Sequence, residues 1–547
     1  MTIRKNLLIL TFWFIAVRLW AQSHLPLVLP PENRDFNASL SFLASDWMEG
    51  REAGTRGNFM AADYIASQLQ LFGLYPVGDS ILVNTEKRAY QKGLLISAFS
   101  YYQNFELIKY STDKADLAIV HHTGNSESAF QFSPGVDFVC KSPLNGTEAL
   151  ASLVFAGYGI AAPEKGYNDY AGLNVKGRIV VVLDGYPGHA DTNSISWKKL
   201  GKQFREDETS PEKKLYTAWK QGALALIFVS PSDLLPTVNQ SPVNKDVVKS
   251  AMNSIKSEDP DYEDSDFALP GDTSLCPIPS FRINSRLNSQ IFDNSGINLS
   301  ETEQKIARTF SPVVKIMEDT KVRFSVSVKA ESVQVRNIIS MIPGKDTTKS
   351  ILVGAHYDHL GKRNALIYNG ADDNASGVSG MLALAKVWSE SSEKPACNLI
   401  FASWTAEEKG LLGSSYFVWK KKPNSAQLLL YINLDMISRS EPEDTARKQL
   451  SIGTMTASNN LRKMAENINL KCPHPLKLDL WDVTGHTGSD YAPFASCKIP
   501  VMTFFSGFHS DYHTPRDIAA NTDPEKMKNI LKIVNDCLLE MISNIHE

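Results

Sequence analysis

The 547-residue sequence has no low-complexity tract, no internal repeat and no cysteine motif. Its six cysteines are scattered without CxxC spacing, so we expect none to act as a nucleophile or a zinc ligand, and any disulfide pairing stays open. The net charge is −4 with both signs interspersed, which gives no basis for a nucleic-acid or anionic-membrane partner. With 43% hydrophobic residues, the chain can bury a sizeable core.

Long apolar runs are missing after the first 21 residues. The start of the chain has Arg4 and Lys5, then LLILTFWFIAV, then a small residue, Ala21, before Gln22, as in a secretory signal peptide. We expect residues 1–21 to be cleaved and the protein to be exported, to the periplasm or outside the cell, with an uncleaved anchor as the alternative. No later stretch is long enough to cross a bilayer, so we expect no stable membrane insertion after cleavage. The sequence does not determine an oligomeric state.

Two regions precede the C-terminal part of the chain. Residues 37–78 have the pattern of two amphipathic helices around a Gly-rich turn, and we interpret them as a packing element. We predict that 22–145 is the N-terminal part of the main domain. Residues 146–300 carry short apolar runs, ASLVFAGYGI, GRIVVVLDG and ALALIFVS, separated by polar, Pro-rich and charged loops. We predict an inserted small α/β module at 146–300, followed by the main domain at 301–547.

Strand-like and helix-like segments alternate from Val335 onward. The apolar runs RNIISMIPG, SILVGAHYD, NLIFASW, LLLYINLDM and IPVMTFFS are separated by amphipathic stretches such as ASGVSGMLALAKVWSE. Apolar runs of this length with helices between them predict an α/β fold with a mixed, mostly parallel central sheet flanked by helices.

Two histidines and three carboxylates follow or flank these runs: His356, Asp372, Glu408, Asp435 and His513. Neutral imidazole and carboxylate both suit zinc, and one bridging carboxylate would give each of two zinc ions three protein ligands and an open position for water. Ligands of open α/β sheets bind outside the carboxyl ends of the strands, so we expect the five residues to meet at one edge. The pattern predicts a hydrolase with two zinc ions per chain.

Two acidic pairs also have simpler interpretations. Asp372 and Asp373 precede a helix, where Asp373 or Asn374 could cap it while Asp372 bridges two metals. Glu407 and Glu408 could merely favour the positive end of a helix dipole. Metal-assisted hydrolysis, however, also needs a base that is not bound to metal. We therefore predict Asp372 as the bridge, Glu408 as a ligand and Glu407 as the general base.

Neighbouring residues have candidate supporting roles. Asp358 can accept a hydrogen bond from the ring nitrogen of His356 that does not face metal, whereas we expect His359 and Lys362 to be solvated loop residues. Tyr512 either donates to the oxyanion of a tetrahedral intermediate or is an ordinary half-buried aromatic. Three polar residues of GHTGSDYAPF either line the pocket or form a structural turn: His486, Ser489 and Asp490.

These segments, taken in order, resemble a known family. GAHYDHLG, GADDNASG, TAEEKGLLGS, NLDMIS and DYHTPRD are similar to the motifs of co-catalytic zinc aminopeptidases of the bacterial leucyl aminopeptidase and aminopeptidase Y type, relatives of glutamate carboxypeptidase. The resemblance covers the chain from Val335 onward and, less fully, LASDWMEGREAGTRG and YYQNFEL. The segment with FAGYGI, KGRIVVVLDG and IPSFRI resembles a protease-associated domain, a module inserted into secreted peptidases.

The resemblance implies a metallo-exopeptidase that hydrolyses the N-terminal peptide bond of peptides with a zinc-activated water. It divides the predicted ligands into two pairs with a shared bridge: His356 with Asp435, Glu408 with His513, and Asp372 between them. Glu407 and Tyr512 carry over as base and oxyanion donor, and Asp358 as the partner of His356. No ligand position is substituted, which argues against an inactive relative.

Three alternatives stay open. A carboxypeptidase of the glutamate type would share all the ligands and differ in a basic pocket for the substrate carboxylate. A glutaminyl cyclase would share the fold but use one zinc ion. A non-catalytic binding protein would differ in zinc content and turnover.

Overall fold

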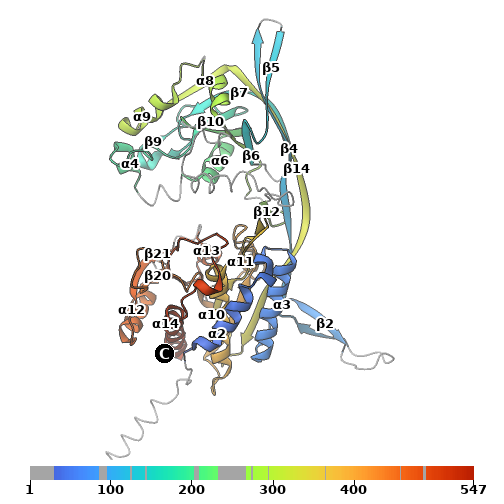
Figure 1. The fold of residues 1–547 in the computed structure, drawn as a ribbon, viewed down its shortest axis with the longest axis vertical. Helices are drawn as coiled ribbons and strands as arrows, with labels where there is room; N and C mark the ends of the chain where they lie inside the picture. Colours follow the sequence, from blue (N-terminus) through green and yellow to red (C-terminus); the bar gives the residue numbers. More distant parts are fainter. Residues whose placement is uncertain are drawn as a thin grey trace, which may run out of the picture. The chain divides into compact units, whose positions relative to one another are not determined.

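The computed structural model describes residues 30–84, 95–123, 126–141, 145–201, 209–231, 266–272, 275–293, 295–363, 365–424, 426–455, 458–483 and 488–546. The chain divides into two compact units (Figure 1). Unit 1 comprises Met1–Leu107 and Val333–Glu547, and unit 2 comprises Ile108–Ser332. The predicted insertion at 146–300 lies within unit 2, whereas its assignment as a protease-associated domain stays a prediction. The predicted signal peptide and His486 lie outside the described residues.

Unit 1 is built on a sheet with a mixed, mostly parallel strand order. From one edge the strands are β21 (Lys477–Asp482), β20 (Gln449–Thr454), β22 (Val501–Phe505), β19 (Leu428–Leu434), β15 (Asp346–His356), β18 (Cys397–Trp404) and the end of β14 (Val314–Ile342). Strands β18, β15, β19 and β22 are mutually parallel, and β14 and β20 pair antiparallel at either side of them. The predicted α/β fold is therefore confirmed.

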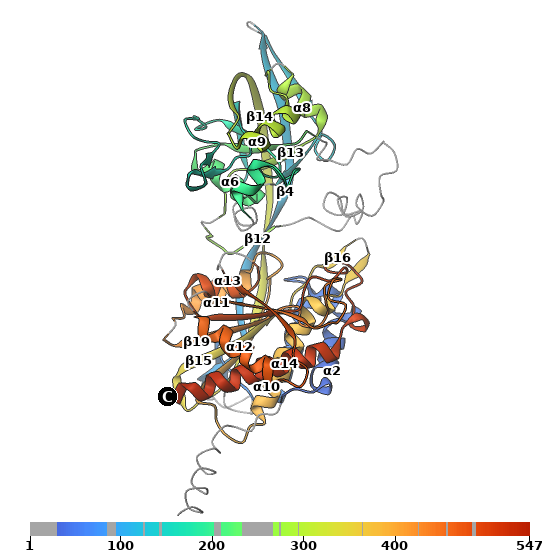
Figure 2. The ribbon, with the colours of Figure 1, turned by 90° about the vertical axis from the view of Figure 1, so that its left-hand side faces the viewer.

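Helices cover both faces of this sheet because its strands are apolar on both sides. Along β15, Ile351 and Val353 pack into one cluster with α2 (Asn33–Leu43), α3 (Arg56–Leu71), α10 (Gly377–Ser389), α12 (Asn459–Lys471) and α14 (Pro524–Ser543). The intervening Leu352 packs into a second cluster with α11 (Leu412–Lys421) and α13 (Tyr491–Ser496). Figure 2 shows α10, α12 and α14 lying beside one another in unit 1. Because the sheet is packed between two apolar layers, the positions of its strand ends are held by the core.

Unit 2 has its own core, and its strands continue the strand order beyond β14. The strands lie in the order β14, β7 (Thr147–Ala156), β10 (Ile179–Leu183), β11 (Ala225–Val229), β13 (Ser280–Ile283) and β6 (Phe138–Lys141). Alternate residues of β10 again face two apolar clusters, one of which contains residues of α8 (Ser285–Phe292) and α9 (Leu299–Thr309) and the other a residue of α6 (Pro211–Lys220). The long strand β4 (Tyr102–Thr123) pairs with β5 (Ser126–Phe132) and with β12 (Asp266–Ala268).

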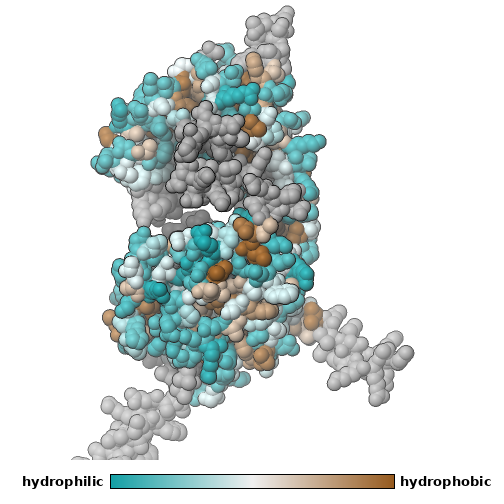
Figure 3. All heavy atoms as spheres, in the orientation of Figure 1, coloured by the Kyte–Doolittle hydropathy of each residue, from teal (hydrophilic) through white to brown (hydrophobic). Residues whose placement is uncertain are grey.

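The visible surfaces of the two units are largely polar, with smaller apolar areas between the polar ones (Figure 3). No helix within the described residues combines the length and apolar character needed to span a membrane.

Candidate metal centre

The predicted site residues meet at the carboxyl ends of the unit 1 strands. His356 is the last residue of β15, and Glu407 and Glu408 follow the end of β18. Asp435 directly follows β19, and His513 lies in the loop after β22. The convergence expected from strand order is therefore present in the structure.

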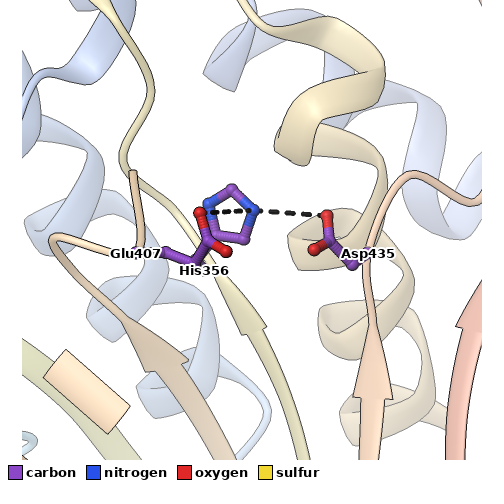
Figure 4. A group of neighbouring side chains, drawn as sticks. All are labelled: His356, Glu407 and Asp435. Carbon is purple, nitrogen blue, oxygen red and sulfur yellow. Dashed lines mark hydrogen bonds and ion pairs between the residues drawn. The ribbon is translucent and has the colours of Figure 1, made fainter. Parts of the chain in front are cut away.

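One group of ligand-type atoms consists of His356, Glu407 and Asp435 (Figure 4). The Nε2 atom of His356 lies 3.2 Å from Asp435 Oδ1 and 3.9 Å from Glu407 Oε2. The Ser489 hydroxyl donates a hydrogen bond to the other oxygen of Asp435, 2.5 Å away, and so holds Oδ1 toward the histidine. Ser489 is thus one pocket residue that the sequence left undecided and the structure places at the site.

A second group brings Glu408 and His513 together with Asp373. His513 Nε2 lies 3.1 Å from Asp373 Oδ2 and 3.3 Å from Glu408 Oε2. Within the described residues this nitrogen has no partner of acceptable hydrogen-bond geometry, although it is buried. Asp373 Oδ1 lies 3.4 Å from His356 Nε2 in the first group, so the two oxygens of Asp373 face both histidines.

Asp373 therefore lies between the two histidines, where the sequence analysis expected Asp372. The Asp372 carboxylate faces elsewhere, because its oxygens accept hydrogen bonds from the backbone N–H groups of Ser438 and Arg439 at 2.9 and 3.0 Å. The backbone N–H groups of Asp372 and Asp373 in turn donate to the buried carboxylate of Asp517. Asp372 and Asp517 thereby tie together the loops that carry Asp373, Asp435 and His513.

Two residues near His356 also differ from expectation. Asp358 approaches the His356 ring with its carbonyl oxygen, 3.2 Å from Nδ1, while its nearest carboxylate oxygen lies 3.8 Å away. The carboxylate instead accepts hydrogen bonds from the backbone N–H groups of Glu407 and Glu408. His359, expected in solvent, is fully buried, and its Nδ1 lies 2.7 Å from Glu408 Oε1. Both residues therefore position the glutamate pair.

The electrostatics of the site follow from packing carboxylates around imidazoles. Burial alone would lower the pKa of His356, but Glu407 and Asp435 raise it well above its usual value. Burial likewise opposes protonation of His513, yet Asp373 and Glu408 raise its pKa to about 10. Burial raises the pKa of Glu407 well above the usual range, and the attraction of His356 only partly offsets this. The site thus concentrates negative charge that calls for cations.

Three of the loops at the site hold non-glycine residues in left-handed backbone conformations. Ala406, Met436 and His513 have φ of 56°, 53° and 55°. Such conformations are uncommon outside glycine and persist where surrounding contacts impose them. Each lies at or next to a candidate ligand or Glu407, so the backbone is bent where these side chains must turn toward one another.

Sequence reasoning missed Arg51, which belongs to the segment interpreted as a packing element. Arg51 is 1% exposed and donates hydrogen bonds to the carbonyl oxygens of Leu43, Tyr357, Asn369 and Gly370. It thereby ties the N-terminal segment to the loops on either side of the site. The sequence shows only that Arg51 is a charged residue within DWMEGREAG, and the pattern does not indicate where its side chain points.

A pocket of about 250 Å³ opens onto these groups. Its lining includes His356, Asp373, the two glutamates, Asp435 and Tyr512, together with apolar and aromatic side chains: Met436, Trp481, Tyr491, Phe505 and Phe508. Burial raises the pKa of Tyr512 far above its usual value, with Asp373 adding to the shift, so its hydroxyl stays protonated. No lysine or arginine lines the pocket among the residues that the structure describes.

Fold and site together define a class of protein: an α/β domain with two histidine–carboxylate groups at the carboxyl edge of its sheet. Residues 337–538 match the model of Peptidase family M28.

Known proteins are similar to parts of the chain or to its fold. Leupeptin-inactivating enzyme 1 of Streptomyces exfoliatus is 29% identical over 177 residues, which covers 32% of this chain and 36% of that enzyme. Aminopeptidase YwaD of Bacillus subtilis is 29% identical over 205 residues, covering 35% of this chain and 41% of that one. The aligned part thus spans less than half the length of these curated relatives. The solved aminopeptidase from Aneurinibacillus sp. strain AM-1 has the same fold, with a TM-score of 0.53 at 20% identity over 93% of each chain.

Proposed function

We propose that the chain is a zinc-dependent exopeptidase that hydrolyses the N-terminal peptide bond of peptides with an apolar first residue. One observation carries this proposal: two histidine–carboxylate groups share Asp373, and Glu407 stands beside them in an aromatic pocket. The match of residues 337–538 to the model of a peptidase family supports it, as does the similarity to aminopeptidase YwaD.

The residues present fit two cations. The buried His513 Nε2 faces two carboxylate oxygens without hydrogen-bonding geometry, and such a nitrogen is satisfied when it binds a metal. We assign His356 and Asp435 to one zinc ion, and Glu408 and His513 to the other, with Asp373 shared. Each ion would then have three protein ligands, the number typical of catalytic zinc sites. The shared residue is the correction to the set inferred from the sequence.

Bound zinc would polarise the peptide carbonyl and lower the pKa of a bound water. Glu407 has the position of a general base beside the proposed ligands: it takes a proton from the attacking water and returns it to the leaving nitrogen as the C–N bond breaks. Tyr512, protonated at neutral pH, donates a hydrogen bond to the oxyanion formed at the carbonyl. Asp358 and Ser489 hold Glu407 and Asp435 in place through the hydrogen bonds described above.

The pocket favours an aminopeptidase over a glutamate-type carboxypeptidase. Recognition of a substrate carboxylate calls for a basic side chain, and the described lining residues include none. The described lining holds no lysine or arginine that would repel a positively charged substrate amine, and the aromatic wall suits an apolar side chain.

A panel of reporter substrates tests this assignment. Free aminoacyl substrates with leucine, phenylalanine, glutamate and lysine are compared with N-blocked peptides and with peptides ending in glutamate, and zinc is measured in the same sample. We expect turnover of free N-termini, fastest for leucine or phenylalanine. Cleavage of N-blocked peptides at a C-terminal glutamate would replace the proposal by the carboxypeptidase. A single bound zinc ion together with cyclisation of N-terminal glutamine would indicate a glutaminyl cyclase. The absence of turnover with every substrate would indicate a binding protein.

The same proposal includes two predictions, one about export of the protein and one about its domain composition. The charged start, apolar run and Ala21–Gln22 junction support export after cleavage of residues 1–21. The strand pattern of 146–300 supports a protease-associated module within unit 2. Sequencing the N-terminus of the mature protein tests the first: a start near Gln22 is expected, and retention of Met1 would contradict it.

A further inference from the structure

We propose that His359 is a positioning residue that fixes Glu408 as a one-oxygen ligand, which makes it a determinant of affinity for the second zinc ion. This inference rests on the proposed pair of cations. The His359 side chain is fully buried, and its Nδ1 lies 2.7 Å from Glu408 Oε1. This is the length of a charge-assisted hydrogen bond. The other oxygen, Glu408 Oε2, lies 3.3 Å from His513 Nε2 and is left for the ion.

The alternative is that His359 binds the metal itself, since its Nδ1 is grouped with Asp373 and Glu408. The opposite ring nitrogen decides between the two roles. Within the described residues Nε2 of His359 is buried and has no hydrogen-bond partner. A buried N–H without an acceptor is rarer in proteins than an unused acceptor, so the ring proton belongs on Nδ1. A protonated Nδ1 donates to Glu408 and has no lone pair to offer a metal.

The surroundings hold the ring in this orientation. A Cβ atom added to Gly370 would lie 2.5 Å from the His359 ring, so glycine lets the chain pass directly against it. Gly370 also has φ of 57°, a left-handed conformation that glycine adopts without strain. Its carbonyl accepts a hydrogen bond from Arg51, whose own carbonyl accepts from the His359 backbone N–H at 3.3 Å. Arg51 and Gly370 therefore clamp His359 from two sides.

Fixing one carboxylate oxygen matters for metal affinity. Glu408 could turn to offer either oxygen or both, and a hydrogen bond to Oε1 removes that freedom before the ion arrives. Loss of such an outer partner typically lowers metal affinity about 10–100-fold. His359 Nδ1 also lies 3.7 Å from Oδ2 of the shared Asp373, the oxygen that faces His513. The two ligands assigned only to the first zinc ion are His356 and Asp435, and the binding step of that ion serves as an internal reference.

The test is a zinc titration of the metal-free full-length chain against a chromophoric chelator, which resolves the two binding steps. The step lost in Glu408→Gln identifies the second ion. We expect His359→Leu to weaken that step about 10–100-fold and to leave the other unchanged. His359→Asn keeps an N–H donor at the place of Nδ1 and should bind like the native chain. If His359→Leu does not fold, as judged by circular dichroism, His359→Ala takes its place.

A double variant separates positioning from direct ligation. If His359 acts through Glu408, adding His359→Leu to Glu408→Gln should weaken zinc binding no further. An unchanged affinity in His359→Leu, equal losses in the Leu and Asn variants, or additive losses in the double variant would each overturn the proposal. These titrations measure zinc binding and not peptide hydrolysis. If the zinc affinities change as predicted but the protein hydrolyses no peptide, the proposed function is overturned while the role of His359 is supported.

Discussion

The two units both bury charged side chains, but they satisfy them differently. In unit 2 the buried Asp169 carboxylate accepts hydrogen bonds from the Tyr158 and Ile160 backbone N–H groups and from the Tyr167 hydroxyl at 2.9–3.1 Å. Buried Lys214 donates to the carbonyl oxygens of Leu183 and Gly185. In unit 1 four carboxylates surround His356 and His513. His356 Nε2 is hydrogen-bonded to Asp435, whereas His513 Nε2 faces Asp373 and Glu408 without hydrogen-bonding geometry among the described residues.

The difference distinguishes buried polar groups that stabilise the fold from buried polar groups that are suited to binding a ligand. A buried polar group whose hydrogen bonds come from the protein favours one arrangement of the chain. Carboxylates gathered at one edge repel one another unless cations lie between them. Unit 1 should therefore depend on metal for part of its stability, and unit 2 should not. The predictions below test the two halves of this contrast.

The largest expected effect concerns Glu407, the carboxylate of unit 1 that we assign to proton transfer and not to metal. Glu407→Gln should lower kcat about 10²–10⁴-fold, because the amide cannot accept the proton of the attacking water. Zinc content, measured by plasma mass spectrometry on the same sample, should stay at the native value. A variant that keeps its turnover, or loses a zinc ion while folded, contradicts this division of roles.

Metal removal comes next. Zinc present at about a thousand times its dissociation constant stabilises the folded state by about 4 kcal/mol, and chelation should remove that stabilisation from unit 1. Hydrogen exchange read peptide by peptide separates the units: backbone protection should fall along β15, β18 and β19 and stay unchanged along β10 and β11. Equal loss of protection in both units would break the comparison.

Unit 2 should instead respond to pH through Asp169. Burial raises the pKa of Asp169 from 3.8 to about 7, so the folded state binds a proton more tightly than the unfolded state. The stabilisation is complete below pH 4 and is lost as the pH rises toward 7, on the order of 4 kcal/mol at about 1.4 kcal/mol per pKa unit. Exchange protection of β10 should fall over that window in the native chain. In Asp169→Asn the protection should be flat over the same window; a slope equal to the native one would exclude Asp169 as its origin.

The smallest expected effect distinguishes the adjacent aspartates. Asp372→Asn should cost about 1–3 kcal/mol of stability, because one of the N–H groups of Ser438 and Arg439 loses its acceptor. It should keep two zinc ions per chain. The matched variant Asp373→Asn should lose zinc with little change in the stability of the metal-free chain. If the two variants show the reverse pattern, the bridge is Asp372 after all. Thermal unfolding without metal and zinc content provide the two readings.

Much of the fold and of the site is predictable from the sequence because the ends of the strands can be predicted. Apolar runs mark β15, β18 and β19, and residues that follow parallel strands share an edge, so His356, Glu408 and Asp435 could be brought together without coordinates. Adjacent residues are different. Asp372 and Asp373 have the same side chain at neighbouring positions, and only the backbone path after Gly370 determines which of them faces the histidines.

The roles of residues that act through buried contacts could not be predicted from the sequence pattern. His359 stands in a polar loop, where a histidine is ordinarily solvated, and its burial depends on the close approach of Gly370. Arg51 lies about 300 residues from the loops that it contacts, 306 positions from Tyr357 and 319 from Gly370. Periodicity describes the faces of helices and strands, whereas such contacts depend on the packing of loops from distant parts of the chain.

Diffraction from crystals of the zinc-loaded protein at the zinc absorption edge tests the central claim most directly. We predict two anomalous peaks about 3.5–4 Å apart. One should lie against His356 and Asp435 and the other against Glu408 and His513, with Asp373 contacting both. A single peak, or a pair of peaks bridged by any other residue, would contradict the account.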